Sequence, residues 1–551
     1  MIDIAGDEHI TVNMFRDHLL IYLFAISWTF LNIYLCFFHS NSAIFWISSL
    51  AAAFSIIIQI NYFNIKMRKF IILEIFLLMI SLKFVSFAID GVNRIPGVDT
   101  YYELDAIRNI INFGWNPNIL NSVASYPCIH FICAFIDEVS CLRADYLIFL
   151  ITIILCILVL SFYILTLNII FIDSRITLLS ALAFVYLSPF VLESFFGRTL
   201  VSQVLFYCVL FLILKCNVHD KIEFSILSIL VISSLLFAHP YARLILLILM
   251  ITMKILHTYS PFIFEDKNNY NLKSPSRILI YLVSVGILAY FIYLAAFERL
   301  IFHNTIQFIF TDSTSLNALG SAPLAPLYWR IYLFGTVTLI IFFTFFLLLS
   351  DKRFIPYYCY VFLICSLVIL FLGYVAYHYN FLPFNRTMSF FWPIFLVPIS
   401  QRIISSKKRL YYSFFIFILI IINIFGYFPS LYDNSYTLDP HLGEIRLYLN
   451  DYELTSINTL NLSGKIIGDY YIHVGYIYYK GYDIFSAKEP YLSNNYNIDY
   501  SWIFIKPVIF IRGDKLFELP KHSYNSFMNN LNLIKVYDNG EINVLGRSQN
   551  I

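Results

Sequence analysis

The chain has 551 residues, of which 60% are apolar and only 13% are charged, and its mean hydropathy is +0.75. A soluble domain is about 45–50% apolar and about 25% charged, so this composition excludes an ordinary water-soluble globule. The formal net charge is +2, from 36 basic and 34 acidic residues, and gives no overall electrostatic reason to expect a nucleic-acid partner. The sequence therefore predicts an all-α protein that crosses a membrane many times.

Apolar runs long enough to cross a bilayer occur between residues 18 and 428. A helix needs about 20 residues to cross hydrocarbon that is about 30 Å thick. On this basis we predict about thirteen spans, at 18–38, 42–63, 69–89, 144–170, 176–193, 200–215, 223–238, 240–257, 277–298, 329–350, 354–377, 387–401 and 410–428. The first run follows an acidic, polar start and has no cleavage pattern, so we expect it to be a retained helix.

The distribution of Lys and Arg predicts the orientation, because cytoplasmic connections are enriched in these residues. With the N-terminus inside, the inner connections hold the 17 residues Arg16, Lys66, Arg68, Lys69, Arg175, Lys215, Lys221, Lys254, Lys267, Lys273, Arg277, Lys352, Arg353, Arg402, Lys407, Lys408 and Arg409. The outer connections before the tail hold the 8 residues Arg94, Arg108, Arg143, Arg198, Arg243, Arg299, Arg330 and Arg386. We therefore place the N-terminus in the cytoplasm and the C-terminus outside the cell membrane.

Residues 429–551 have a mixed composition and differ from the apolar part of the chain. The segments KIIGDYYIHVGYIYYKG and YSWIFIKPVIFIR are β-branched and aromatic, as strands are. The segment LIKVYDNGEINVLGR has a DNG turn between apolar runs, which is a strong hairpin signal. We predict a small extracytoplasmic α/β domain that buries its own core.

The connection 90–143 lies between predicted spans 69–89 and 144–170 and is the first long connection on the outer side. Within it, the sequence predicts a helix from Asp99 as N-cap to Gly114 as stop, and a second short helix around 126–138. One face of the first helix is apolar, and it consists of Leu104, Ile107, Ile110 and Ile111. We expect both helices to lie on the outer membrane surface.

This connection also gathers carboxylates beside the membrane. Asp90 lies where the preceding span ends, and Asp99 and Glu103 are four residues apart, so the last two can face the same way at a helix start. A carboxylate at this depth can act as a general base on a hydroxyl whose reaction partner is a membrane lipid.

Four segments carry a resemblance to a known family. DTYYELDAIRNII followed by GWNP, then LSPFVLESFFGRTLVSQ, SSLLFAHPYARLILL and FNRTMSFFWPIFLVPIS, occur in this order at predicted outer positions. Together they are similar to the glycosyltransferase C superfamily, which includes protein O-mannosyltransferases, aminoarabinose transferases and oligosaccharyltransferases. The resemblance covers about residues 69–428, so residues 1–68 form two extra N-terminal helices, and 429–551 is similar to the appendage that many members have.

The resemblance implies an inverting transfer of a hexosyl or pentosyl group from a polyprenyl-phosphate donor to an extracytoplasmic glycan, lipid or protein. Asp99 would be the general base, with Glu103 and Asp90 as supporting carboxylates. Cations and donors are needed where negative charge develops on the departing phosphate, and the candidates are Arg386, Arg198, Arg243 and His239. The sequence shows no second D-x-D pair, so it leaves the use of a divalent metal, Mg²⁺ or Mn²⁺, open.

Each candidate also has a structural interpretation. Asp99 can serve only as a helix cap, and Glu103 only as a solvated or structural residue. Arg198 and Arg243 can extend to the membrane interface, and His239 before Pro240 can be a turn residue.

Two other functions remain open at this stage. A cell-surface polysaccharide polymerase or ligase would use the same donors, and it would tend to have Arg and His in one large late outer loop. A transporter or lipid flippase would need a polar path through the bilayer. The clear ionisable residues inside the spans are Glu74 and Lys83, and we expect these to pack inside the bundle.

The predicted orientation can be tested with a topology reporter. An enzyme that is active only outside the cell, fused after residue 440, should be active, because residues 429–551 are predicted to lie outside. The same enzyme fused after Lys408 should be inactive. Activity of the second fusion without the first would reverse the orientation and remove every site candidate named above.

Overall fold

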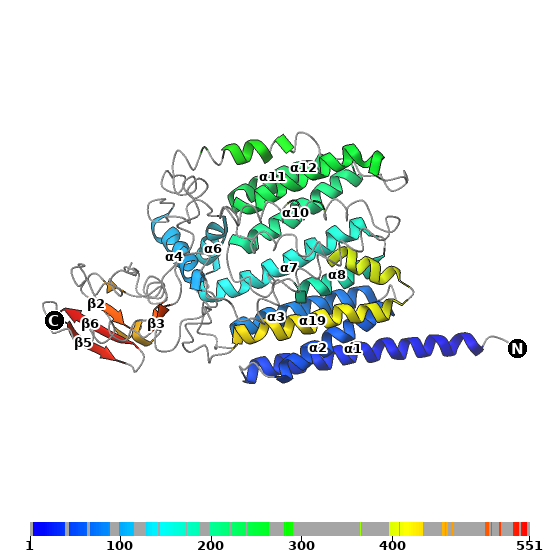
Figure 1. Ribbon diagram of the computed structural model, residues 1–551, viewed down its shortest axis with the longest axis horizontal. Coiled ribbons are helices and arrows are strands. Elements are labelled where there is room, and N and C mark those ends of the chain that lie inside the picture. Colours follow the sequence, from blue (N-terminus) through cyan, green and yellow to red (C-terminus); the bar gives the residue numbers. More distant parts are fainter. Residues whose placement is uncertain are drawn as a thin grey trace.

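The computed structural model shows a bundle of long apolar helices with a small β-sheet at one end (Figure 1). The residues that the structure describes are 4–38, 43–62, 67–88, 98–114, 128–140, 144–171, 173–187, 198–219, 222–238, 240–263, 280–281, 283–289, 292, 364, 368, 396–406, 408–432, 455–457, 459–460, 466–467, 502–505, 508–509, 517–518, 533–538 and 542–547. Predicted spans 329–350 and most of 354–377 lie outside these residues. The number of spans therefore stays a prediction.

The N-terminal part consists of α1 (Ile4–Phe38), α2 (Ala43–Asn61) and α3 (Arg68–Ala88). These helices pack against one another, and the first turns of α1 project beyond the bundle (Figure 1). The middle part consists of α7 (Ala144–Ile170), α8 (Ser174–Leu187), α10 (Arg198–His219), α11 (Ile222–Ala238) and α12 (Pro240–Ile263). Helix α19 (Arg409–Tyr432) returns to pack against α2 and α8.

Three of the described helices are long and apolar enough to cross a membrane, over His18–Phe37, Ile44–Asn61 and Leu147–Ile170. Shorter apolar segments lie in α8, α10, α11, α12 and α19. On the outer face of α1, large apolar side chains recur every three or four residues and stay exposed: Leu19, Leu23, Ile26, Phe30, Ile33 and Phe37. Such a face is stable only in hydrocarbon or against another apolar surface, so this is a membrane protein.

Polar side chains inside the bundle form hydrogen bonds between helices. The Tyr186 hydroxyl on α8 lies 2.8 Å from Ser49 Oγ and donates to the Ser49 carbonyl at 2.9 Å. Gln59 Nε2 donates to Glu74 Oε2 at 2.9 Å, which joins α2 to α3. Glu74 and Lys83 are 5% and 1% exposed, so both are packed in the bundle, as the sequence predicted. These bonds fix the packing of helices whose apolar surfaces alone do not specify a partner.

The C-terminal region contains β1 (Ile466–Ile467), β2 (Trp502–Ile505), β3 (Val508–Ile509), β4 (Phe517–Glu518), β5 (Leu533–Asp538) and β6 (Asn543–Arg547). One sheet has the order β1-β2-β6-β5, and β3 pairs with β4. The predicted hairpin is confirmed, because β5 and β6 pair antiparallel on either side of the DNG turn. Most of residues 429–551 lie outside the described residues, so an α/β domain remains a prediction.

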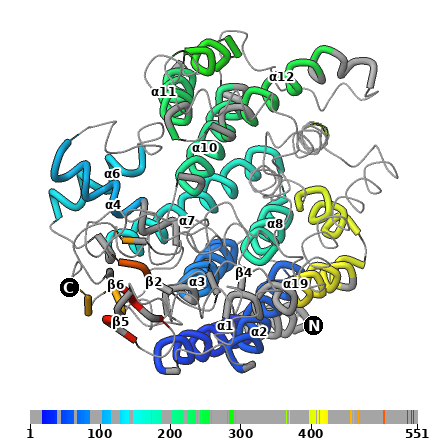
Figure 2. The backbone as a smooth tube through the Cα atoms, turned by 60° about the vertical axis from the view of Figure 1, so that its left-hand side comes forward, coloured from blue at the N-terminus to red at the C-terminus, as the bar shows by residue number. Residues whose placement is uncertain are grey.

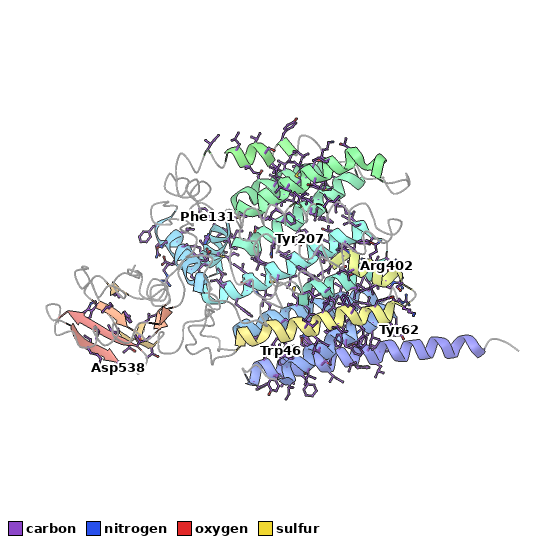
Figure 3. The ribbon with its side chains drawn as sticks, viewed as in Figure 1. Trp46, Tyr62, Phe131, Tyr207, Arg402 and Asp538 are labelled. Carbon is purple, nitrogen blue, oxygen red and sulfur yellow. The ribbon has the colours of Figure 1, made fainter. Side chains whose placement is uncertain are left out.

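The bundle has two distinct ends. The sheet and two short helices, α4 (Val98–Phe113) and α6 (Cys128–Ser140), lie at one end, and the N-terminus lies at the other (Figures 1 and 2). Arg402, which the sequence places among the cytoplasmic cations, lies at the opposite end from Phe131 of α6 (Figure 3). The orientation of the bundle in the membrane stays a prediction.

The Tyr186 contact gives a test of the bundle packing. Tyr186→Phe should lower the free energy of unfolding by about 1–2 kcal/mol, because it leaves the buried Ser49 groups without this partner. Tyr22→Phe is the matched control, because Tyr22 is 64% exposed on α1. The free energy of unfolding of both variants can be measured by titration with SDS in mixed micelles. Equal stability of the two variants would contradict the contact.

Candidate functional site

Helix α4 begins at Val98, two residues before the start that an N-cap at Asp99 would give. The predicted N-cap is therefore wrong, and Asp99 lies in the first helical turn. A carboxylate in this turn interacts favourably with the positive end of the helix dipole. The helix stops as predicted: Gly114 has a φ of 68°, and its N–H donates to the Ile110 carbonyl at 2.9 Å. Glycine adopts this left-handed conformation without steric cost, and the bond satisfies one of the free carbonyls at the helix end.

The apolar face of α4 packs on α6, which lies close to the predicted range 126–138. On α4, Leu104, Ile107 and Ile110 are buried, whereas Arg108 is exposed. The buried side chains of α6 are Ile129, His130, Cys133 and Ala134. The amphipathic pattern therefore predicted the buried face of α4 correctly. This face packs against a second short helix, α6.

Glu103 projects from α4 into this interface. Its carboxylate Oε2 is in hydrogen-bonding contact with Nε2 of His130 on α6. Glu103 is 6% exposed and His130 is fully buried. Glu103 is thus a buried residue that joins two helices, which agrees with a structural role rather than a solvated one.

His130 is a residue that the sequence analysis missed. Its Nδ1 has no hydrogen-bond partner in the part of the chain that the structure describes. The available signal was its place among Ile129, Cys133 and Ala134 on one face of a short amphipathic helix. A histidine on such a face is expected to be buried, but the pattern does not identify its partner.

The environment of this pair is of low polarity and carries negative charge. Burial, together with the nearby Glu103 carboxylate, raises the pKa of the Cys133 thiol far above its usual range. Burial and the adjacent Glu138 also raise the pKa of Asp137 at the end of α6. The Cys133 thiol is therefore neutral at physiological pH and serves as a small apolar side chain here.

Other parts of the bundle meet at the same place. A single hydrophobic cluster contains α4 and α6 side chains together with Val201 of α10, Ala238 of α11, and Phe504 and Val544 of the sheet. α6 also contacts α7, α10 and α11. The start of α10, the end of α11 and the C-terminal sheet therefore converge on the α4–α6 pair.

This convergence bears on the remaining candidates. Arg198 is the first residue of α10, and Arg243 lies in the first turn of α12, so their backbones begin at this end of the bundle. Asp90, His239 and Arg386 lie outside the described residues. Within the described part of the chain, no group of three His, Cys, Asp or Glu side chains could hold a metal ion.

The comparisons with known proteins give structural matches only. No family model matches the sequence, and no curated protein sequence matches it significantly. Two similar structures are crystal structures of the Archaeoglobus fulgidus oligosaccharyltransferase, one tethered by a disulfide bond to an acceptor peptide with the NVT sequon and one with Zn and sulfate.

The similarity to these structures is distant. The first has 11% identity and a TM-score of 0.45, and it covers 75% of this chain and 64% of the other. The second has 12% identity and a TM-score of 0.44, and it covers 78% of this chain and 68% of the other. This chain thus spans about two thirds of the length of the matched structures. The function proposed below rests on the residues of this chain.

Proposed function

We propose that this protein is an integral-membrane glycosyltransferase of the glycosyltransferase C type. It moves a hexosyl or pentosyl group, with inversion, from a polyprenyl-phosphate donor to an acceptor outside the membrane. The observation that carries the proposal is the position of α4: its first turn contains Asp99, and it packs with α6 at the end of an apolar bundle. This position supports the proposal, because a base at the end of an apolar bundle can reach the head group of a membrane lipid.

The chemistry of such a donor explains why this position is useful. A sugar attached through phosphate to a polyprenol stays at the membrane surface, so the enzyme has to present its base there. Phosphate is a good leaving group and needs no general acid. The acceptor hydroxyl is a weak nucleophile, and its attack is assisted by a carboxylate that accepts its proton.

The residues then have distinct roles. Asp99 accepts the proton from the acceptor hydroxyl as the new bond to the anomeric carbon forms and the bond to phosphate oxygen breaks. Arg386, Arg198, Arg243 and His239 are the groups proposed to bind the departing phosphate, where developing negative charge is stabilised most by preorganised cations. Asp90 is proposed as a supporting carboxylate. Glu103 supports the site from within the α4–α6 interface.

A divalent metal has no assigned step in this mechanism. Mg²⁺ or Mn²⁺ would be bound by carboxylates, and the described residues do not form a group of three such ligands.

The activity itself can be measured with purified protein. Incubation with labelled polyprenyl-phosphate sugars and a mixture of glycan, lipid and peptide acceptors should release the free lipid phosphate and label one acceptor class. A labelled growing glycan would identify a polymerase. Movement of intact donor across a vesicle bilayer without cleavage would instead show a flippase and overturn the proposal.

The base can be tested with Asp99→Asn. Asparagine has nearly the size of aspartate but cannot accept the proton, so sugar transfer should fall by on the order of a hundredfold or more while the helix is kept. Asp105→Asn is the matched control, because Asp105 lies on the same helix and accepts a hydrogen bond from Asn109 at 2.9 Å. If Asp99→Asn transfers sugar at the wild-type rate, Asp99 only stabilises the start of the helix and is not the general base.

The phosphate site can be tested with Arg386→Lys. Loss of the planar guanidinium should lower turnover at least tenfold even though the charge is kept, because an ammonium cannot make the same bidentate contact with phosphate. Arg402→Lys is the control, because Arg402 lies at the opposite end of the bundle from Phe131 of α6 (Figure 3). If donor affinity and turnover are unchanged in Arg386→Lys, this arginine does not bind the phosphate.

A further inference from the structure

The contact between Glu103 and His130 is a polar bond inside an apolar helix interface. The side chains around it are Leu104 and Ile107 on α4 and Ile129 and Ala134 on α6, all of them buried. The interface would be apolar without Glu103 and His130. Both side chains lose their hydrogen bonds to water when the two helices pack. The structure therefore keeps a costly pair where two aliphatic residues would pack well.

The contact joins Nε2 of His130 to the carboxylate of Glu103. When this carboxylate is ionised it is only an acceptor, and Nε2 then donates its N–H to it. Nδ1 is buried and has no partner among the described residues. The imidazole is thus held by the Glu103 contact at one nitrogen. This contact fixes the position of α6 along the axis of α4.

The location of Glu103 gives this contact a consequence for the reaction. Asp99 precedes Glu103 by four residues, so it lies about one turn nearer the start of α4, on the same side of the helix. A rotation or axial shift of α4 on α6 would move both carboxylates together. Aliphatic side chains resist such a shift weakly, whereas a directional N–H···O bond opposes it.

We propose that His130 is a positioning residue for sugar transfer. By donating Nε2–H to Glu103, it sets the rotation and register of α4 on α6 and thereby the place of Asp99. This inference rests on the proposed function for its effect on catalysis. The effect on α4 itself can be measured without any activity.

The first experiment measures kinetics in the full-length protein with a labelled polyprenyl-phosphate donor. His130→Leu should lower kcat on the order of a hundredfold with little change in the KM for the donor, because the base is misplaced while the donor site is intact. His130→Gln should keep kcat within about tenfold of wild type, since its amide N–H can replace the Nε2 donor. Cys133→Ala is the matched control, a truncation in the same interface, and should be near wild type.

The double variant Glu103→Leu/His130→Leu separates positioning from stabilisation. Two leucines should give a folded protein, because apolar replacements of a buried polar pair are tolerated. Its kcat should stay as low as that of His130→Leu. If the double variant transfers sugar at the wild-type rate, the pair only stabilises the interface and the inference is overturned.

The second experiment measures hydrogen–deuterium exchange in nanodiscs. Amides of residues 99–103 should exchange faster in His130→Leu than in wild type, whereas those of α7 should not change. Unchanged exchange at residues 99–103 would overturn the inference, whatever the kinetics. An inactive wild-type protein would overturn the proposed function alone, since the exchange measurement still decides whether His130 holds the start of α4.

Discussion

Hydrocarbon offers no hydrogen-bond partner to a peptide group, and the rest of this structure depends on that constraint. Helices satisfy their own backbone groups, so the apolar chain folds into long helices such as α1, α2 and α7. The few polar side chains within the bundle then have to find partners among themselves, as Tyr186 does with Ser49 and Gln59 with Glu74. These bonds select which helices become neighbours.

The same constraint confines reactive groups to the ends of the bundle. Under the proposed function, residues that meet both a lipid-linked donor and an acceptor outside the membrane work only where the apolar helices end. The pair α4 and α6 occupies such an end, with the sheet and the starts of α10 and α12 beside it. Glu103 and His130 make this pair more specific than its aliphatic side chains alone would.

The sequence was sufficient for features that depend on local pattern. The apolar period of α4 predicted its buried face, and Gly114 predicted its end, because only a residue without a side chain adopts a φ of 68° freely. The bounds of α7 and the hairpin of β5 and β6 also followed from local pattern and turn chemistry. Composition alone indicated a membrane protein.

Tertiary structure alone decided which distant residues meet. No local pattern connects Glu103 with a histidine 27 residues later, because the loop between α4 and α6 does not specify how the two faces oppose each other. The same holds for Asn61, whose side chain bonds Ser413 across most of the chain at 2.9 Å. Hydropathy is a property of each segment by itself, whereas a pair depends on how two segments pack, and the packing is resolved only when the whole bundle forms.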